Sequence, residues 1–241
     1  MAAAEVCHSR LFVVSAGLGL ISAAAEAPAY NLTLVSGSPD DITRKLRRGT
    51  SGDWWDCISD GSSPVGEALG DQGIILAALS RPYLAMVGRE WSRWPPDLKD
   101  RLRLFTLDRS GVPEGLQQFL MPYDERLETL GAGHAGTRSD FAQRALRHFA
   151  THFASTSGDV QQHAEMVRRA LAPFSMPVVP DRERLTDHEI IGLIHREWDA
   201  VGGRSGAMLV HLRRGLDVAC EQGRFKLLFA RAAQERQGPP L

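Results

Sequence analysis

Short apolar runs in the first half of the chain predict four β-strands. Residues 11–16 combine aromatic and β-branched side chains and lead into a Gly-Leu-Gly turn, so we expect a strand followed by a glycine turn. A second strand is expected over residues 30–34. Residues 73–79 form a continuous apolar run, the pattern of a buried parallel strand. Residues 101–107 alternate polar and apolar, which predicts a half-exposed strand.

Helical patterns separate and follow these strands. Residues 36–64 are rich in Gly, Ser, Asp and Thr, which indicates a loop with one or two short helices. Ser139 is expected to cap the third of the longer helices. Strands separated by helices predict an α/β fold, with a small parallel or mixed sheet flanked by helices. The longer helices are predicted over residues 83–94, 113–121, 139–153 and 159–171.

Ligands of such sheets bind at the carboxyl ends of the strands. This rule places on one rim the residues that follow three of the predicted strands. Tyr123-Asp124 and Thr137-Arg138 are either further rim residues or ordinary loop and helix-start residues. The three expected rim segments are Ser15-Ala16-Gly17, Ser80-Arg81 and Asp108-Arg109.

A proline-rich stretch divides the chain. Three prolines between residues 172 and 183 indicate a linker, so we expect an α/β domain over residues 1–172 and a smaller module over residues 181–241. In that module Thr186 caps a first helix, Gly202-Gly203 forms a turn, and two more helices follow. Helix, glycine turn, helix, turn and helix is the layout of a helix-turn-helix module.

Charge is balanced over the whole chain but not within this module. The net charge is −1, so no global field indicates a nucleic-acid partner. From residue 200 onward, however, seven basic residues face three acidic ones, whereas residues 181–199 carry three basic and six acidic residues. This split predicts a helix that contacts phosphates, with DNA favoured over RNA. The alternative is an ordinary three-helix cap with solvated arginines. The predicted nucleic-acid contacts are Arg204, Arg213, Arg214, Arg224 and Lys226.

Cysteine usage and the N-terminus bear on the compartment. Three widely spaced cysteines form no disulfide framework or cysteine zinc site, which favours a reducing, cytoplasmic environment. Residues 11–29 resemble a secretory signal, but the β-branched cluster and paired glycines favour a strand and a turn. Glu26 and Pro28 interrupt the apolar stretch too early for a membrane span. No membrane partner is expected.

Three short motifs carry a family resemblance. They are SAGLGLI from residue 15, PAYNLTL from residue 28 and SGDWWDC from residue 51. Over roughly residues 11–130 the chain resembles the YaaA-like peroxide-stress proteins, whose relatives are attached to enzymes of 7-deazaguanine bases. The resemblance implies a nucleic-acid-associated α/β domain, with action on bases as one implied activity. Two features depart from that family: there is little room for a strand before residue 11, and its helix-hairpin-helix is not recognisable. A looser likeness is to prokaryotic antiviral DNA glycosylases.

The same region contains the residue types that base excision needs. An aromatic ring stacks the extruded base, amide donors read it, and a carboxylate stabilises the sugar cation or activates water. Asp53 and Asp56, three residues apart, are expected to share a helix face and act as the catalytic carboxylates. The alternative is that Asp53 is a helix N-cap and the tryptophans beside it are core. The substrate-binding candidates are Ser15, Gly17, Gly19, Tyr30 and Asn31.

Other chemistry is less well supported by the sequence. Only three lysines are present against 25 arginines, so a monofunctional hydrolytic glycosylase fits better than a Schiff-base lyase. His148 and His152, with His134 and His163, have no fourth metal ligand, and surface histidines are favoured over a metal site. Ser15 has no nearby His and Asp in the order that the catalytic triad of a serine hydrolase requires. No metal and no cofactor are expected.

The leading hypothesis is therefore a DNA-binding glycosylase that hydrolyses the N-glycosidic bond to a modified base, such as one in phage DNA, in antiviral defence or DNA repair. The alternative is a non-catalytic DNA-binding stress-response or regulatory protein whose α/β domain binds a nucleoside or a partner. The two hypotheses differ in the expected place of the aspartates. A glycosylase needs Asp53 or Asp56 free in a pocket beside Tyr30, whereas a non-catalytic protein would use it to cap a helix. The sequence does not determine the oligomeric state.

Overall fold

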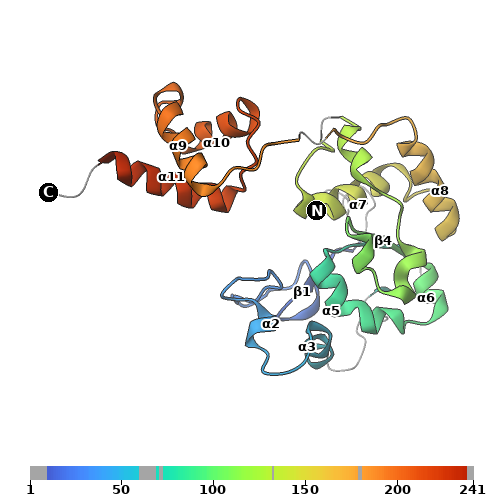
Figure 1. Cartoon of the computed structure of the whole chain (residues 1–241). Helices are drawn as coiled ribbons and strands as arrows, with labels where there is room; N and C mark the ends of the chain where they lie inside the picture. The colour runs from blue at the N-terminus through green and yellow to red at the C-terminus, as the bar shows by residue number, and fades with distance from the viewer. Residues whose placement is uncertain (1–9, 60–68, 71–72, 132, 179–180, 238–241) are drawn as a thin grey trace. The chain divides into compact units, whose positions relative to one another are not determined.

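The chain divides into two compact units, Met1–Pro177 and Val178–Leu241, shown in Figure 1. The boundary falls inside the proline-rich stretch. The computed structural model describes residues 10–59, 69–70, 73–131, 133–178 and 181–237.

The first unit begins with an antiparallel hairpin. Strand β1 (Phe12–Ser15) pairs with β2 (Gly19–Ser22), with Ser15 opposite Gly19. The predicted first strand is confirmed, but the predicted second strand over residues 30–34 is wrong. The second strand starts at Gly19, whose φ of +72° suits a tight reversal that glycine adopts without strain. Residues 30–34 form only an isolated bridge, between Thr33 and Asp41.

A parallel strand pair lies at the centre of the unit. Strand β3 (Ile75–Ala78) pairs with β4 (Leu102–Phe105), and α5 (Arg81–Ser92) and α6 (Pro96–Asp100) connect them. The fold is therefore α/β, as predicted, with the strands in two separate two-stranded sheets. Pro95 and Pro96 follow α5, consistent with the predicted end of that helix.

Both faces of the parallel pair are covered. Ile75 and Ala77 pack into a cluster with α3 (Ser51–Ile58) and α5, whereas Leu76 and Ala78 pack into a second cluster with α7 (Phe141–His152). Residues that alternate along a strand point to opposite faces. Because each face meets helices, the apolar pattern of residues 73–79 is continuous rather than alternating.

Strand β4 is fully buried, which corrects the predicted half-exposed strand. Its polar position, Arg103, is 1% exposed. The guanidinium is accommodated because it donates hydrogen bonds to the carbonyl oxygens of Asp100 and Gly158, at 2.8 and 3.1 Å, and to His163. Alternation along β4 therefore marks two buried faces and not a solvent face.

The remaining helices of the unit differ in detail from the sequence prediction. Residues Glu114–Phe119 form a 3₁₀ helix in the predicted helical stretch. Ser139 does not cap α7, because a 3₁₀ turn over Arg138–Asp140 precedes it and Thr137 forms the capping box with Asp140. Helix α8 (Val160–Leu171) begins after Asp159, its N-cap. The short α2 spans Ile42–Lys45.

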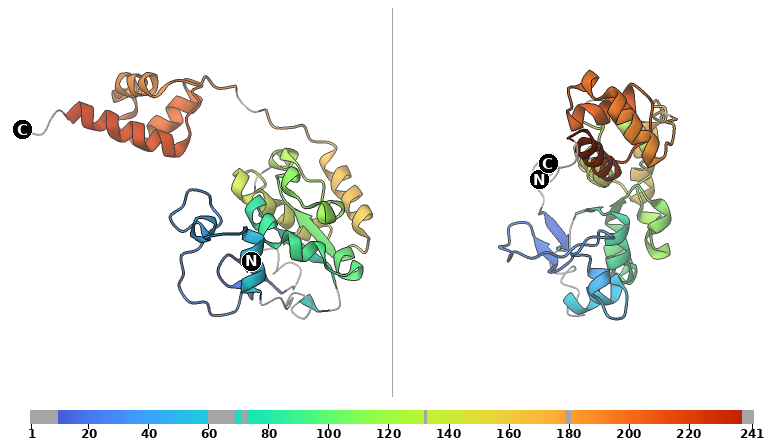
Figure 2. Two further views of the ribbon diagram at one scale, coloured as in Figure 1. Left: turned by 60° about the horizontal axis from the view of Figure 1, so that its bottom comes forward. Right: turned by 60° about the vertical axis from the view of Figure 1, so that its left-hand side comes forward.

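Three helices form the second unit, α9 (Asp187–Glu197), α10 (Ser205–Arg214) and α11 (Gln222–Gln237). They lie together in both views of Figure 2, around a core that includes Ile190, Met208 and Phe225. Thr186 caps α9 through a capping box with Glu189, as predicted for the cap. Gly202 and Gly203 have φ values of +61° and +64° and form the turn. The helix-turn-helix interpretation itself remains a prediction.

Candidate functional sites

The Tyr30 side chain lies against the turn of the β1–β2 hairpin. Its hydroxyl forms a short hydrogen bond with Oγ of Ser15, and that Oγ accepts the N–H groups of Gly17 and Leu18 at 3.2 and 3.0 Å. A Cβ at Gly17 would lie 2.9 Å from Cε2 of Tyr30, so the ring approaches the bare backbone. Three predicted substrate-binding residues, Ser15, Gly17 and Tyr30, thus meet in what we call the hairpin corner.

Gly19 and Asn31 complete the predicted substrate-binding set. Gly19 pairs with Ser15 across the hairpin. Asn31 is exposed, and its side chain forms no hydrogen bond with another described residue. Nε1 of Trp54 donates to the carbonyl oxygen of Ala16 at 2.8 Å, which attaches the hairpin corner to α3.

Arg89 on α5 binds both aspartates of α3. Its Nη2 lies 2.9 Å from Oδ1 of Asp53 and 2.5 Å from Oδ2 of Asp56, so the two carboxylates share a helix face as their spacing predicts. Asp53 also accepts hydrogen bonds from the N–H and hydroxyl of Thr50, the N-cap of α3. Thr50, and then Arg89, lower the pKa of Asp53. An ionised Asp53 balances positive charge but is a poor general acid at neutral pH.

The tryptophans between these aspartates have structural partners. Trp55 is 1% exposed and donates from Nε1 to Glu90 in a short hydrogen bond. Trp54 holds the hairpin corner. Thr50, and not Asp53, is the N-cap of α3, and Asp53 is its partner in the capping box. Trp55 is a core residue, as the alternative interpretation expects. The aspartates therefore have a demonstrable role in joining α3 to α5.

A pocket of about 170 Å³ opens where β3 and β4 end. We call it the strand-end pocket. Ser80, Arg81 and Asp108 line it, as the carboxyl-end rule predicts for the residues after these strands. The predicted rim segment Ser15-Ala16-Gly17 is not among the described lining residues, because β1 belongs to the separate hairpin. Arg109 is not among them either. Arg138, an open alternative in the sequence, lines the pocket together with Thr106 and Ser139.

Sequence reasoning missed Thr106 and Ser139 as pocket residues. Thr106 directly follows β4, which is the signal that could have identified it. Ser139 comes from the segment before α7, and nothing in the sequence brings this segment to the ends of β3 and β4. The structure supplies that link, since α7 packs on both strands.

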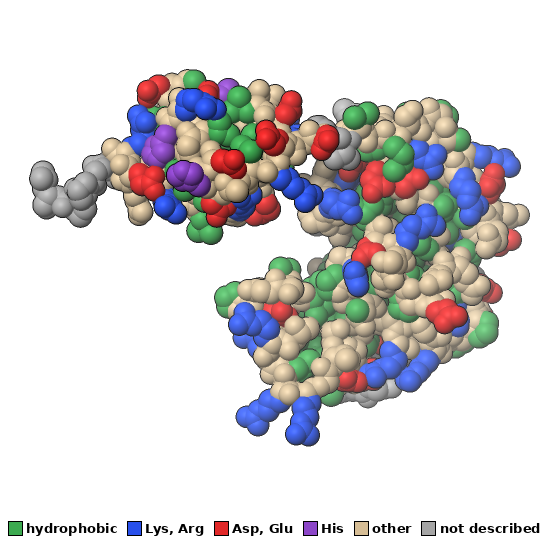
Figure 3. All heavy atoms as spheres, viewed as in Figure 1, with side chains coloured by type: hydrophobic (Ala, Val, Ile, Leu, Met, Phe, Trp, Pro, Cys, Tyr) green, Lys and Arg blue, Asp and Glu red, His purple; other side chains and the backbone are tan. Residues whose placement is uncertain are grey.

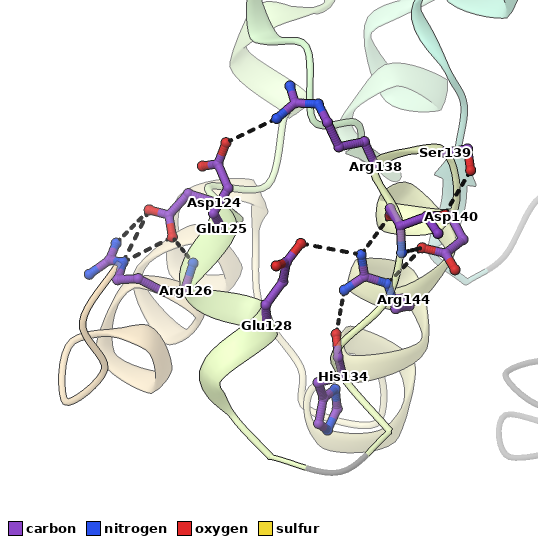
Figure 4. Close-up of polar contacts among 10 residues, drawn as sticks. Asp124, Glu125, Arg126, Glu128, His134, Arg138, Ser139, Asp140 and Arg144 are labelled. Atoms are coloured by element: carbon purple, nitrogen blue, oxygen red, sulfur yellow. Dashed lines mark hydrogen bonds and ion pairs between the residues drawn. The ribbon is translucent and has the colours of Figure 1, made fainter. Parts of the chain in front are cut away.

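Arg144 holds the segment that carries Arg138 and Ser139. Figure 4 shows its guanidinium pointing at this segment. It donates to the carbonyl oxygen of Thr137 at 2.7 Å and to Oδ1 of Asp140 at 2.9 Å, and it forms a short hydrogen bond with the carbonyl oxygen of His134. Among the described residues, Arg138 itself has one loose contact, 3.8 Å, with Glu125. With respect to these residues its guanidinium is available at the pocket.

The second unit contains a larger hollow of about 640 Å³. Two of the predicted nucleic-acid residues, Arg213 and Arg224, line it together with Arg182 and Arg184. We call it the arginine hollow. Two acidic residues, Asp181 and Glu221, also line it. Sequence reasoning assigned residues 181–199 to an acidic half and so missed Arg182 and Arg184, which come from that stretch.

Several of these arginines also support the fold. Arg213 donates from Nε and Nη2 to the carbonyl oxygen of Cys220 at 3.0 and 2.7 Å. Arg224 binds Asp187 at 2.6 Å and the carbonyl oxygen of Leu185 at 2.8 Å. Arg182 donates from Nε to the carbonyl oxygen of Arg213 at 2.9 Å. Three of the four guanidinium groups that line the hollow are thus anchored to backbone carbonyl oxygens.

The other three predicted phosphate contacts lie outside the described lining of the hollow. Arg204, Arg214 and Lys226 are exposed. Arg204 makes one long hydrogen bond, 3.4 Å, to the carbonyl oxygen of Val201, and the side chains of Arg214 and Lys226 have no polar partner among the described residues. On the face seen in Figure 3, acidic and basic side chains are interspersed.

No protein-family model, curated protein or solved structure matches this chain. The resemblance to YaaA-like proteins therefore remains a prediction.

The histidines are partly core residues, which corrects the preference for surface histidines. His148 and His163 are 4% and 1% exposed. Nδ1 of His148 lies 2.7 Å from the hydroxyl oxygen of Tyr123. The His148 ring also contacts the rings of His134 and His152. Among the described residues no set of three or more His, Cys, Asp or Glu side chains could hold a metal ion. Within the same residues, no helix has the length and apolar character to span a membrane.

Proposed function

We propose that this protein binds nucleic acid, with DNA as the favoured partner, through its C-terminal three-helix unit. The observation that carries the proposal is the arginine hollow, whose lining includes four arginines and two acidic residues. Guanidinium groups present several N–H donors in a plane and match phosphate geometry better than ammonium groups do. A chain with 25 arginines and three lysines supplies this chemistry.

The anchored arginines keep donors free for a ligand. Arg213 and Arg224 use Nε and Nη2 for the fold and leave Nη1 without a partner among the described residues. Arg184 is exposed, and its side chain has no polar partner among these residues. Guanidinium groups that are already held by carbonyl oxygens lose little further side-chain entropy when they bind phosphate.

The acidic residues at the hollow weaken the positive field but do not cancel it. The carboxylate of Glu221 accepts the N–H groups of Gly223 and Arg224 at the start of α11, at 2.8 Å each, and these bonds lower its pKa. Glu221 is therefore committed to the helix start. This leaves the arginines as the groups that determine which ligand charge is preferred.

Base excision remains a separate prediction, and the proposed binding function does not depend on it. Both predicted catalytic carboxylates are held by Arg89. The hairpin corner supports a base-contacting role in one respect: Tyr30 is 41% exposed, and its hydroxyl is held by Ser15. An exposed aromatic ring is the usual stacking platform for an unpaired base.

Fluorescence anisotropy with the full chain tests the binding function. Labelled duplex DNA, single-stranded DNA and RNA of equal length are titrated at about 50 mM and about 200 mM salt. Four phosphate contacts predict a fall in affinity of about two orders of magnitude over this range. Absence of binding to every nucleic acid at low salt would overturn the proposal. Equal binding to polyglutamate would show that the hollow recognises acidic protein instead.

A second assay separates binding from catalysis. Plain and phage-modified DNA are incubated with the protein, and released bases are sought by mass spectrometry. Release would support base excision, and an abasic strand that breaks only after alkali or heat would support the monofunctional subtype. Intact DNA in a sample that still binds would support the non-catalytic alternative.

A further inference from the structure

The strand-end pocket has the architecture of a β–α–β ligand site. Strand β3 ends at Ala78, helix α5 begins at Arg81, and the parallel strand β4 returns to end at Phe105. In such units a phosphate binds at the start of the helix, and an acidic residue after the next strand accepts sugar hydroxyls. The residues that occupy these two places here are Ser80-Arg81 and Asp108.

The phosphate side of the pocket holds unused donors. Ser80 is the N-cap of α5, but its hydroxyl makes no cap hydrogen bond. Arg138 also lines the pocket, and among the described residues its guanidinium has one contact, at 3.8 Å from Glu125. Arg144 binds the carbonyl oxygen of Thr137 and the carboxylate of Asp140, on either side of Arg138 in the sequence. The start of α5, a hydroxyl without a hydrogen bond to another described residue and a guanidinium thus line one pocket.

Thr106 provides an independent indication of a ligand. Its side chain lines the pocket, yet the residue is only 3% exposed. Its hydroxyl forms no hydrogen bond with another described residue. The hydroxyl oxygen is not one of the fully buried side-chain atoms without a partner, which among the described residues are Nε1 of Trp91 and Nε1 of Trp94, so it is accessible from the pocket. A ligand oxygen in the pocket would form a hydrogen bond with it.

Asp108 decides which class of ligand fits. A carboxylate disfavours a simple anion, but it accepts hydrogen bonds from hydroxyl groups. Oδ1 of Asp108 accepts the Ser110 hydroxyl at 2.6 Å, and Oδ2 accepts Arg81 at 3.2 Å. The Ser110 hydrogen bond, and then Arg81, lower the pKa of Asp108, so it is an acceptor at neutral pH.

The size of the pocket limits the ligand further. At about 170 Å³ it is smaller than the roughly 300–1,000 Å³ of sites that enclose a whole drug-sized ligand. It is suited to one moiety, and a base attached to that moiety would extend outward.

We propose that the strand-end pocket binds a ribose phosphate moiety, with the phosphate on Arg138 and the start of α5 and the sugar hydroxyls on Asp108. Thr106 donates to, or accepts from, the same ligand at the base of the pocket. This site lies wholly in the first unit and does not involve the arginine hollow. The proposal therefore stands or falls independently of nucleic-acid binding by the second unit.

Isothermal titration calorimetry with the full chain tests the proposal, and the probes are ribose 5-phosphate, 2-deoxyribose 5-phosphate, ribose and inorganic phosphate. Ribose 5-phosphate is expected to bind most tightly. Loss of the 2-hydroxyl is expected to weaken binding about tenfold or more, since it removes a hydrogen bond to a charged group. Equal affinity for ribose 5-phosphate and inorganic phosphate would overturn the sugar part of the proposal, and absence of binding by every probe would overturn all of it.

Variants connect the binding to this pocket. Arg138→Ala and Asp108→Asn are each expected to weaken ribose 5-phosphate binding at least tenfold. Asp108→Asn should also abolish the preference for ribose over deoxyribose. Thr106→Val should weaken binding and Thr106→Ser should restore it, which separates loss of the hydroxyl from misfolding. The matched control is Arg109→Ala, next to Asp108 but outside the described lining. Equal effects of Arg138→Ala and Arg109→Ala would contradict the site.

Discussion

The buried guanidinium of Arg103 donates a hydrogen bond from Nε to Nδ1 of His163, over 2.9 Å. This contact joins strand β4 to helix α8 across 60 residues of sequence. Because Nδ1 is the acceptor, the proton of the neutral imidazole lies on Nε2, which donates to the carbonyl oxygen of Thr156 at 3.0 Å. Burial is the main reason that the pKa of His163 is lowered, and the neutral form is the one that accepts from Arg103.

Replacement of Arg103 is expected to be among the most damaging single changes in the first unit. Arg103→Met removes the donor to His163 and leaves the carbonyl oxygens of Asp100 and Gly158 without that partner. We expect a loss of about 3 kcal/mol in the free energy of unfolding, measured by urea denaturation. Arg109→Met, a surface arginine, should change it by less than about 0.5 kcal/mol. Equal losses in the two variants would contradict the role of Arg103.

Stability is expected to fall in acid because of His148. Burial, followed by the charges of His152 and His134, lowers the pKa of His148 from 6.5 to about 4. The folded state therefore favours the neutral form of His148. The resulting contribution to the free energy of unfolding is fully present above pH 6.5 and is lost as the pH falls toward 4. Urea titrations across this window should show a loss of up to about 3 kcal/mol from this group.

The paired variant Tyr123→Phe with His148→Phe provides the control for that measurement. It removes the titrating imidazole and the phenol that contacts it through Nδ1, so neither buried polar group is left alone. Stability of this variant should fall less steeply between pH 6.5 and 4 than that of the natural chain, although His163 and His134, whose pKa values are also lowered, still contribute. An unchanged slope would show that His148 is not responsible.

The hairpin corner predicts a specific steric coupling. In Gly17→Ala the new methyl would lie 2.9 Å from Cε2 of Tyr30 and 3.2 Å from Cδ1 of Leu32, so the ring must move. We expect a loss of about 1 kcal/mol and a changed Tyr30 environment in NMR spectra. The double variant Gly17→Ala with Tyr30→Ala should be less destabilised than the sum of the single variants. Simple additivity would refute the contact.

The N-cap of α3 gives a separate test of the role of Asp53. Thr50→Ala removes the hydroxyl that accepts the N–H of Asp53 and donates to its carboxylate, and should cost about 1 kcal/mol. Asp53→Asn should also lower stability, because the carboxylate is bound by Thr50 and Arg89. If Asp53→Asn abolished base release without any change in the urea midpoint, the carboxylate would be catalytic and not structural.

Part of this fold could be predicted because local pattern and tertiary packing agree. The apolar run at residues 73–79 contains a buried strand with helices on both faces, and Pro95-Pro96 lie between the end of α5 and the rest of α6. At β4 the local sequence pattern and the tertiary packing disagree. Alternation normally marks a solvent face, but the long side chain of Arg103 finds acceptors inside the protein, and no local pattern reports partners 55 and 60 residues away.

In the candidate sites, too, the local sequence pattern does not report partners that are distant in the sequence. The spacing of Asp53 and Asp56 correctly predicts a shared helix face, yet the partner Arg89 is 33 residues beyond Asp56. The carboxyl-end rule correctly places Ser80, Arg81 and Asp108 on one rim, but Arg138 and Ser139 join them only through the packing of α7. For the arginine hollow, counting charge by segment separates Arg184 from Arg213, although the two side chains line one hollow.

The salt dependence of DNA binding by two single-arginine variants tests the central claim most directly. Arg184 lines the arginine hollow, whereas Arg231 pairs with Glu235 on α11 and is not among the described lining residues; each change to Ala removes one positive charge. We predict that Arg184→Ala reduces the slope of log affinity against log salt by about 0.9 and that Arg231→Ala leaves it unchanged. Equal slopes in the two variants, or an unchanged slope in Arg184→Ala, would contradict binding at the hollow.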